Sequence, residues 1–313
     1  TIPAVHADRL RHAELTGRRA VALAEEDLRP SRIMTADAFR NALTTLQAIG
    51  GSTNGLVHIT AVARRLGIDI DLEEFDRIGR EVPVVVDLKP SGEHYMEHLH
   101  EAGGLNAVLR EIRPHLAVDA MTVSGQSLDA NIDTGEIVRG QSVVRSRETP
   151  IAPSGGIAVL NGNLAPRGAI IKHSAATPSL LRHSGRAVVF DSVEDMSDRI
   201  DDPDLDVTAE DVLVLRNAGP KGAPGMPEAG YIPIPKKLAT QGVKDMVRIS
   251  DARMSGTAVG TIVLHSTPES WGGGPLALVR DGDRIELDVP NRRITLDVSE
   301  EELAERGRNW TPP

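Results

Sequence analysis

The chain has 313 residues, a net charge of −10 at pH 7, 40% hydrophobic residues and no cysteine. This composition is typical of a globular protein with a sizeable core, and the acidic balance argues against nucleic acid or an anionic membrane surface as the main partner. The lack of cysteine excludes disulfides and any thiolate-held metal or iron–sulfur cluster built from this chain alone. We find no apolar run of transmembrane length and expect a cytoplasmic protein.

The first part of the chain, residues 1–115, has the apolar spacing of amphipathic helices. Residues 5–28 predict a helix that ends before Pro30. Thr35 then predicts the N-cap of a second helix, which Gly50 ends. Its expected buried face consists of Phe39, Leu43, Leu46 and Ile49.

A third helix, after Gly51, is predicted by the spacing of Leu56, Ile59, Ala63 and Leu66. Asp71 and Glu74 have capping-box spacing at the start of a further helix, and the β-branched run 82–86 predicts a buried strand. Later helices are expected to bury Met96, Leu99, Leu105, Val108, Leu109 and Ile112. We therefore predict that residues 1–115 form the helix-rich part of an α/β domain.

Residues 116–313 have a different pattern, with short apolar runs between turns rich in Gly, Asn, Pro and Asp. These runs are 157–160, 169–171, 187–190, 212–215, 246–249 and 261–264. A hairpin is predicted around the turn 290–293, because apolar and polar residues alternate strictly on both sides of it. We therefore predict a second, β-rich domain that forms a barrel or a closed mixed sheet.

Two glycine-rich loops each follow one of these buried runs. Residues 219–228, with the sequence GPKGAPGMPE, end in Glu228, and residues 251–257, DARMSGT, contain Ser255 and Thr257. Glycine and proline at this density let the backbone approach a ligand closely. One such loop is typical of a surface turn, and Glu228 alone is typical of a helix start, but two loops with reactive side chains favour a site.

These loops resemble the C-terminal signature of the dihydroxy-acid and sugar-acid dehydratase family, the iron–sulfur hydro-lyases that include phosphogluconate dehydratase. The resemblance extends, in the family's order, over 50–54 (GGSTN), 87–92 (DLKPSG), 161–166 (NGNLAP) and 290–293 (PNRR). It therefore covers essentially the whole chain.

The resemblance implies an α/β protein whose second domain is a swivelling β-barrel like that of aconitase-type enzymes. It also implies Mg²⁺ and an iron–sulfur cluster, whose cysteines lie in a portion of family members that precedes the residues seen here. We therefore expect the chain to be the C-terminal part of a longer enzyme and to be inactive alone.

The resemblance also assigns roles to residues. Glu228 corresponds to a Mg²⁺ ligand and Ser255 to the base that takes the α-proton. We expect Thr257 to be a substrate-positioning hydroxyl, and Arg253 either offsets negative charge beside the serine or is structural. Secondary substrate-binding candidates lie in the loop 50–54: Ser52, Thr53 and Asn54.

The expected reaction is dehydration of a hydroxy acid to a 2-keto-3-deoxy acid. Residues 251–261, DARMSGTAVGT, are more similar to the pentonate dehydratases than to relatives whose loop is closer to DGRFSGG, which favours a sugar acid such as arabinonate or xylonate. The alternatives are a dihydroxy-acid dehydratase of branched-chain amino-acid synthesis and a cysteine-free, non-catalytic relative. The expected partners are the small hydroxy acid and further copies of the chain in a homodimer or homotetramer.

Two groups of basic residues are weaker candidates. His94, His98 and His100 are predicted to share one helix, where a solvated face is favoured over a metal site because the sequence lacks the glutamate of an HExxH motif. Lys172 and His173 end a predicted strand and could meet an anionic substrate.

Overall fold

A computed structural model describes residues 1–134 and 138–313. The chain forms two compact units. The first consists of residues 1–51 and 55–156, and the second of residues 52–54 and 157–313.

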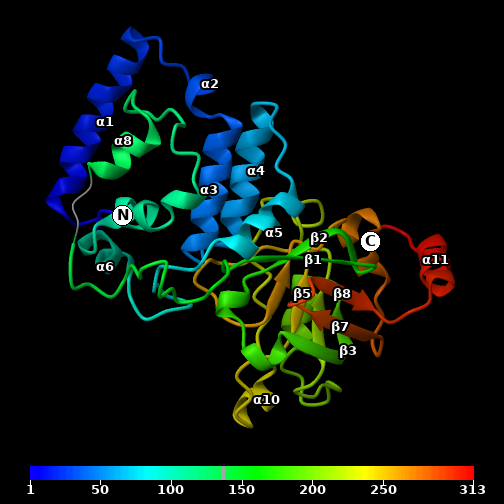
Figure 1. Cartoon of the computed structure of the whole chain (residues 1–313). Coiled ribbons are helices and arrows are strands. Elements are labelled where there is room, and N and C mark those ends of the chain that lie inside the picture. The colour runs from blue at the N-terminus through cyan, green and yellow to red at the C-terminus, as the bar shows by residue number, and fades with distance from the viewer. Residues whose placement is uncertain (135–137) are drawn as a thin grey trace. The chain divides into compact units, whose positions relative to one another are not determined.

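The first unit is built from helices joined by extended segments (Figure 1). The helices are α1 (Ala7–Glu25), α2 (Pro30–Ile33), α3 (Ala36–Ala48), α4 (Thr53–Arg65, from Gly55 on in this unit), α5 (Leu72–Glu81), α6 (Met96–Glu101), α7 (Gly104–Glu111), η1 (Arg113–His115) and α8 (Leu128–Asp133). Helices α3 and α4 lie side by side, and a Cβ at Gly55 would meet Leu46 Cδ1 at 2.9 Å. Glycine at position 55 therefore permits the close packing of these two helices.

The helix starts follow the predicted caps. The Thr35 hydroxyl accepts a hydrogen bond from Ala38 N at 3.3 Å, which confirms this N-cap. Asp71 also caps its helix, but it accepts from Glu73 N at 2.9 Å instead of pairing with Glu74 in a capping box. The capping prediction is therefore confirmed at both sites, with a different partner at the second.

Two predictions for the first unit are wrong in detail. Residues 82–86 are buried but form no regular strand, because only Val84 and Val86 pair, through isolated bridges to Ala152 and Val144. Met96 and Leu105 are 55% and 48% exposed, although the other four residues predicted to be buried with them are buried. Both lie in the first turn of a short helix, and a short helix has too few residues for apolar spacing to define its buried face.

Residues 116–134 and 138–156 pack with the first unit. Asn41 on α3 holds Ala117 through two hydrogen bonds, of 2.8 Å from Ala117 N and 3.0 Å to Ala117 O. The change between compact units therefore falls at 156/157, whereas the sequence placed the domain boundary at 115/116.

The second unit is a closed barrel of eight strands in the order β1-β2-β6-β5-β4-β3-β7-β8 (Figure 1). The strands are β1 (Ala158–Gly162), β2 (Ala165–Ile171), β3 (Arg182–Phe190), β4 (Val212–Leu215), β5 (Arg248–Ser250), β6 (Ile262–Leu264), β7 (Arg284–Asp288) and β8 (Arg293–Leu296). Strands β3, β4, β5 and β6 are parallel neighbours, and β7 pairs with β8 as the predicted hairpin. The predicted α/β class and closed mixed sheet are confirmed.

Apolar residues of all eight strands fill the barrel, and short helices surround it. These helices are η2 (His173–Ala175), η3 (Pro178–Leu180), α9 (Val193–Arg199), α10 (Lys236–Thr240), η4 (Ser270–Gly272), η5 (Pro275–Leu278) and α11 (Glu300–Asn309). In the hairpin, Ile285 lies opposite Leu296, and both are buried. Arg306 fixes α11 to the barrel through an ion pair with Asp283, and within α11 it pairs with Glu302 at 2.6 Å.

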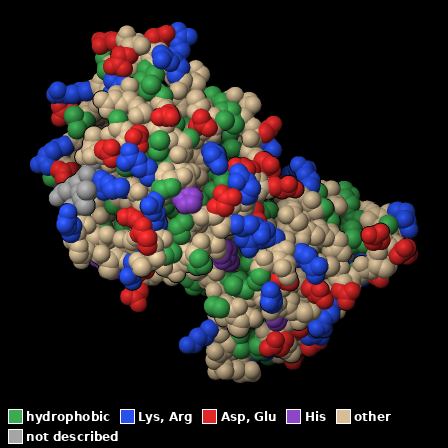
Figure 2. All heavy atoms as spheres, in the orientation of Figure 1, with side chains coloured by type: hydrophobic (Ala, Val, Ile, Leu, Met, Phe, Trp, Pro, Cys, Tyr) green, Lys and Arg blue, Asp and Glu red, His purple; other side chains and the backbone are tan. Residues whose placement is uncertain are grey.

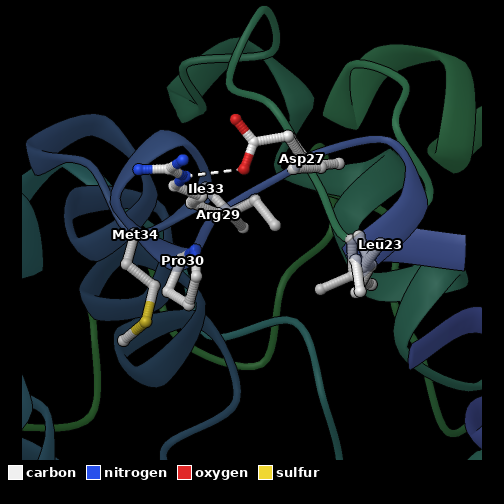
Figure 3. A pocket seen from close by; sticks show the side chains of 9 residues that line it. Leu23, Asp27, Arg29, Pro30, Ile33 and Met34 are labelled. Carbon is white, nitrogen blue, oxygen red and sulfur yellow. Dashed lines mark hydrogen bonds and ion pairs between the residues drawn. The ribbon is translucent and has the colours of Figure 1, made fainter. Parts of the chain in front are cut away.

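The first unit contains an apolar pocket of about 420 Å³ between α1 and α2 (Figure 3). Its wall includes Leu23, Ile33 and Met34, and its polar feature is the ion pair of Asp27 with Arg29 at 2.7 Å. Acidic and basic side chains are interspersed on the face drawn in Figure 2. In the part of the chain that the structure describes, no helix is long and apolar enough to cross a membrane.

Candidate active site

Three loops leave the barrel at one edge. Strands β4, β5 and β6 are parallel neighbours, with Leu215 beside Ser250 and Ile249 beside Val263. Their carboxyl ends therefore meet, and the loops that begin at residues 216, 251 and 265 start side by side. In sheets with parallel strands this edge is where ligands bind. Both predicted glycine-rich loops lie here, together with a third loop that sequence reasoning missed.

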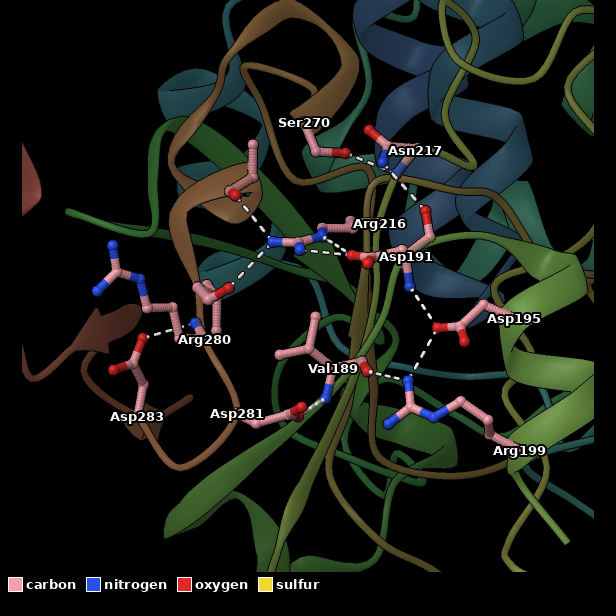
Figure 4. Close-up of polar contacts among 12 residues, drawn as sticks. Val189, Asp191, Asp195, Arg199, Arg216, Asn217, Ser270, Arg280, Asp281 and Asp283 are labelled. Atoms are coloured by element: carbon pink, nitrogen blue, oxygen red, sulfur yellow. Dashed lines mark hydrogen bonds and ion pairs between the residues drawn. The ribbon is translucent and has the colours of Figure 1, made fainter. Parts of the chain in front are cut away.

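Asp251 holds the three loops together. Its carboxylate is 1% exposed and accepts hydrogen bonds from Ala218 N at 3.1 Å, from Ser270 N at 3.0 Å and from the Ser270 hydroxyl. Ser270 Oγ in turn accepts from Asn217 N at 2.6 Å, as Figure 4 shows. A buried carboxylate with these donors is fully engaged in the frame, so Asp251 positions the loops.

Glycine and a second carboxylate make the first loop compact. Glu269 accepts a hydrogen bond from Lys221 N at 2.7 Å. A Cβ at Gly219 would lie 2.8 Å from Glu269 Oε2, and one at Gly222 would lie 2.4 Å from Asn217 O. These glycines are therefore required by close packing within the edge.

Arg216 fixes the start of the first loop (Figure 4). Its guanidinium pairs with Asp191 and donates to the carbonyl oxygens of Ala277 at 2.8 Å and Val279 at 3.0 Å. Three side-chain hydrogen bonds to neighbouring segments therefore hold Arg216 at the point where the loop leaves β4.

Glu228 pairs with Arg253 across the first two loops. The distance from Arg253 Nη1 to Glu228 Oε1 is 2.9 Å, and Arg253 Nε also donates to Met226 O. Glu228 is 44% exposed and lies in a turn, and the next helix begins only at Lys236. The interpretation of Glu228 as a residue at a helix start is therefore wrong.

Ser255 and Thr257 form a hydroxyl pair two residues beyond Arg253. Their oxygens are 2.9 Å apart, and Thr257 N donates to Ser255 Oγ at 3.4 Å. Ser255 is half-buried and Thr257 is exposed. Two groups of the second loop, the Thr257 hydroxyl and the Thr257 N–H, can therefore donate a hydrogen bond to Ser255 Oγ.

Residues 52–54 belong to the second unit and lie against this loop. Asn54 Nδ2 donates to Met254 O at 2.9 Å, and a Cβ at Gly256 would lie 2.9 Å from Ser52 Oγ. Thr53 is only 2% exposed. The structure thus brings Ser52 and Asn54 to the second loop, whereas the Thr53 side chain is buried.

His265 is the first residue of the third loop and was missed by sequence reasoning. Its φ is +55°, and its N–H donates to Ala252 O at 3.2 Å. Burial, and then the Arg253 guanidinium, lower the pKa of His265 to about 4, so the imidazole is neutral at pH 7. The apolar run 261–264 that precedes it was the available signal, since it marks a third strand end.

The other basic candidates lie elsewhere. His94 precedes α6 instead of sharing it with His98 and His100, so that part of the helix prediction is wrong, although the His94 and His98 rings are 5.5 Å apart. Lys172 follows β2, which is antiparallel to β6, and is therefore at the opposite end of β6 from His265. It is 5% exposed, and burial lowers the pKa of its ammonium group to about 8.

The donors at the edge fit the implied cofactors only in part. Among the described residues no group of three His, Asp or Glu side chains could hold a metal ion. Asp251 and Glu269 are engaged by backbone N–H groups, which leaves Glu228 as the available carboxylate among these three. One carboxylate fits one ligand position of Mg²⁺, which binds few protein ligands. An iron–sulfur cluster does not fit, because the chain has no thiolate.

Comparison with known proteins assigns the chain to a family. The dihydroxy-acid/6-phosphogluconate dehydratase C-terminal model matches residues 142–313, and the corresponding N-terminal model matches residues 1–131. An L-arabinonate dehydratase of Rhizobium leguminosarum is 51% identical over 99% of this chain and 54% of its own length. An L-arabonate dehydratase of Azospirillum brasilense is 50% identical over 97% of this chain and 53% of its own length.

A dihydroxy-acid dehydratase of Caldanaerobacter subterraneus is 43% identical over 100% of this chain and 56% of its own length. The chain therefore spans about half the length of the curated relatives that it matches. The matches cover nearly all of its residues and agree with the resemblance seen in the loop sequences. The chain belongs to the dihydroxy-acid/6-phosphogluconate dehydratase family.

Proposed function

We propose that the chain is part of a hydro-lyase that removes water from C2 and C3 of an aldonate such as arabinonate and gives a 2-keto-3-deoxy acid. The observation that carries the proposal is the meeting of the Glu228–Arg253 pair and the Ser255–Thr257 hydroxyl pair at one edge of parallel strands. The higher identity to arabinonate dehydratases, 51% and 50%, than to a dihydroxy-acid dehydratase, 43%, supports a sugar acid as substrate.

Ser255 is the proposed base. Removal of the proton on C2, next to a carboxylate, needs an oxygen that can hold negative charge before it takes the proton. The Thr257 hydroxyl at 2.9 Å and the Thr257 N–H at 3.4 Å can both donate to Ser255 Oγ. Donors to the charged form of a group favour that form, so this arrangement raises the share of Ser255 that has released its own proton to water and can take the proton from C2.

Glu228 and Arg253 are the proposed charged groups of the site. Glu228 would supply one ligand to Mg²⁺, and that ion would supply positive charge to the carboxylate of the substrate. Arg253 belongs to the loop of Ser255, pairs with Glu228 and carries a charge that opposes the negative charge of Ser255 and substrate. Exposed Thr257 would accept a hydrogen bond from a substrate hydroxyl while it donates to Ser255, and Ser52 is a further candidate from the neighbouring segment.

Any iron–sulfur cluster of the enzyme would take its thiolates from outside this chain, because the chain has none. We further propose that the barrel moves as a swivelling domain and that the enzyme is a cytoplasmic homodimer or homotetramer. The family membership of the chain supports these proposals.

The test is a comparison of substrates with the enzyme that contains this chain. Formation of the 2-oxo acid is followed for L-arabinonate, D-xylonate, 6-deoxy-6-sulfo-D-gluconate and 2,3-dihydroxy-3-methylbutanoate. We expect kcat/KM for a pentonate to exceed that for the branched-chain substrate at least about tenfold, because a site built for substrate hydroxyls rejects analogues that lack them. A preference for the branched-chain acid would favour the dihydroxy-acid dehydratase alternative, and no turnover of any substrate would favour the non-catalytic one.

A further inference from the structure

The proposed function leaves His265 without a role, although it lies on the same edge of the barrel. Its main-chain N–H donates to Ala252 O, and the next residue along the second loop is Arg253. The loop of His265 is therefore joined to the loop that carries Arg253.

The backbone of His265 is held in an unfavourable conformation. A positive φ of 55° is unfavourable for a residue with a Cβ. Three hydrogen bonds maintain it, from His265 N to Ala252 O, from Ser266 N to Ser250 O at 3.2 Å and from Thr267 Oγ1 to His265 O at 2.8 Å. Strain of this kind clusters at functional sites, where the surrounding structure imposes it.

The His265 imidazole has a buried nitrogen that makes no hydrogen bond to the described residues. Within residues 1–134 and 138–313, His265 Nε2 has no hydrogen-bond partner. A buried polar atom without a partner is uncommon in folded proteins and lowers the stability of the folded state. A neutral imidazole can accept a hydrogen bond at one nitrogen, so this atom is a possible acceptor in another state of the site.

Arg253 is the donor that would need such an acceptor. Its Nη1 is committed to Glu228, the residue proposed as a cation ligand. A divalent cation on Glu228 would compete with this ion pair and repel the guanidinium, whose Nε remains anchored on Met226 O. The guanidinium would then be released from Glu228 and able to turn toward another acceptor.

We infer that His265 is a positioning residue that serves as the second acceptor of Arg253, to which the guanidinium turns when Glu228 binds a cation. The inference rests on the proposed role of Glu228 as a cation ligand. It gives the site two states, with Arg253 bound to Glu228 in the free chain and to His265 Nε2 in the cation-loaded enzyme.

The first test needs no catalysis. The chain is labelled with ¹⁵N-histidine, and the His265 resonances are assigned by their loss in His265→Gln. Glu228→Ala removes the first acceptor of Arg253, so we expect the His265 Nε2 resonance to shift in the direction of a hydrogen-bonded acceptor. Glu286→Ala, which removes an exposed carboxylate on β7, is the charge-matched control and should leave it in place. An unchanged His265 Nε2 resonance in Glu228→Ala overturns the inference.

The second test uses the enzyme that contains this chain. His265→Leu removes the acceptor and His265→Gln retains one. We expect the Mg²⁺ concentration for half-maximal rate to rise about tenfold, about 1.4 kcal/mol, in His265→Leu and to return to within about threefold of wild type in His265→Gln. Equal Mg²⁺ dependence in both variants and wild type overturns the inference, whatever their stability. An enzyme with no turnover would contradict the proposed function. The resonance test needs no turnover and would still decide whether His265 accepts from Arg253.

Discussion

Two regions of the barrel differ in whether their buried polar groups have hydrogen-bonding or ionic partners. In the β7–β8 hairpin and the adjoining α11, apolar residues alternate inward, and the buried Arg306 guanidinium is paired with two carboxylates. At the carboxyl ends of β4, β5 and β6, three residues other than glycine have a positive φ, Asn217, Met226 and His265, whereas the hairpin has one, Arg292 in its turn. Two buried polar atoms at the same edge, His265 Nε2 and Ser266 Oγ, have no hydrogen-bond partner among the described residues.

The difference indicates which region serves stability and which serves chemistry. Strain and unpaired polar groups lower the stability of the folded state and persist where function uses them. Substitutions of Glu228 and Ser255 at the β4–β6 edge should therefore change rate or ligand affinity with little effect on folding. Substitutions around the hairpin and α11 should change folding with little effect on rate.

The largest effect is expected for Ser255→Ala. Loss of a general base lowers kcat about 10²–10⁴-fold, whereas loss of one hydroxyl hydrogen bond lowers the free energy of unfolding by only about 1 kcal/mol. Steady-state kinetics and urea unfolding of the same variant measure both quantities. Ser197→Ala, an exposed serine on α9, is the control. A kcat within a few-fold of wild type would make Ser255 a turn residue and remove the distinction between the two regions.

Arg306→Met should have the next largest effect, and on stability alone. The side chain is 7% exposed, and its removal leaves Asp283, 11% exposed, without its ionic partner. We expect the free energy of unfolding to fall by about 3 kcal/mol, measured by chemical denaturation, with kcat unchanged. Arg308→Met, an exposed neighbour on α11, should change stability little. A loss of rate without a loss of stability would show that α11 takes part in the chemistry.

Glu228→Gln should weaken cation binding. A neutral amide is a poorer ligand than a carboxylate for a hard cation, and even outer partners of metal ligands affect affinity by about 10–100-fold. We expect the Mg²⁺ concentration for half-maximal rate to rise at least about tenfold, with an unchanged free energy of unfolding. The measurement is a Mg²⁺ titration of rate, with Glu286→Gln as the control. Wild-type Mg²⁺ dependence would show that Glu228 is not a ligand.

Lys172→Met should have the smallest effect, and it should raise the free energy of unfolding instead of lowering it. The folded-state pKa of about 8 is below the ordinary value of 10.5, so the unfolded chain binds more protons between these pH values. The resulting penalty to folding is full below pH 8 and disappears as the pH rises toward 10.5. We expect the variant to be about 1 kcal/mol more stable than wild type at pH 7, with a gain that shrinks above pH 8. Denaturation at pH 7 and pH 9.5 checks this, and a gain independent of pH would assign it to packing.

Local patterns accounted for the elements that local interactions determine. The hairpin followed from strict alternation around residues 290–293, and the cap at Thr35 followed from one side chain next to its own helix. Residues 82–86 were predicted less well, because their β-branched composition shows burial but does not specify pairing partners.

The frame of the site could not be read from the sequence. Asp251 contacts Ala218 and Ser270 only because β5 lies between β4 and β6, and the order of strands in a barrel is a long-range property. His265 could not be identified from the sequence either, because it reaches this edge only through the position of β6 beside β5. The loops that carry Glu228 and Ser255 were found because their glycines and reactive side chains are adjacent in the chain.

The most direct test of the central claim, that the β4–β6 edge removes a proton from C2 of a sugar acid, is exchange of that hydrogen with solvent. L-arabinonate is incubated in D₂O with wild-type enzyme and with Ser255→Ala, and deuterium at C2 is measured by mass spectrometry. If Ser255 is the base, Ser255→Ala binds the substrate and Mg²⁺ but incorporates no deuterium above the no-enzyme control. Exchange at the wild-type rate in Ser255→Ala would contradict the account, because another group would then be removing the proton.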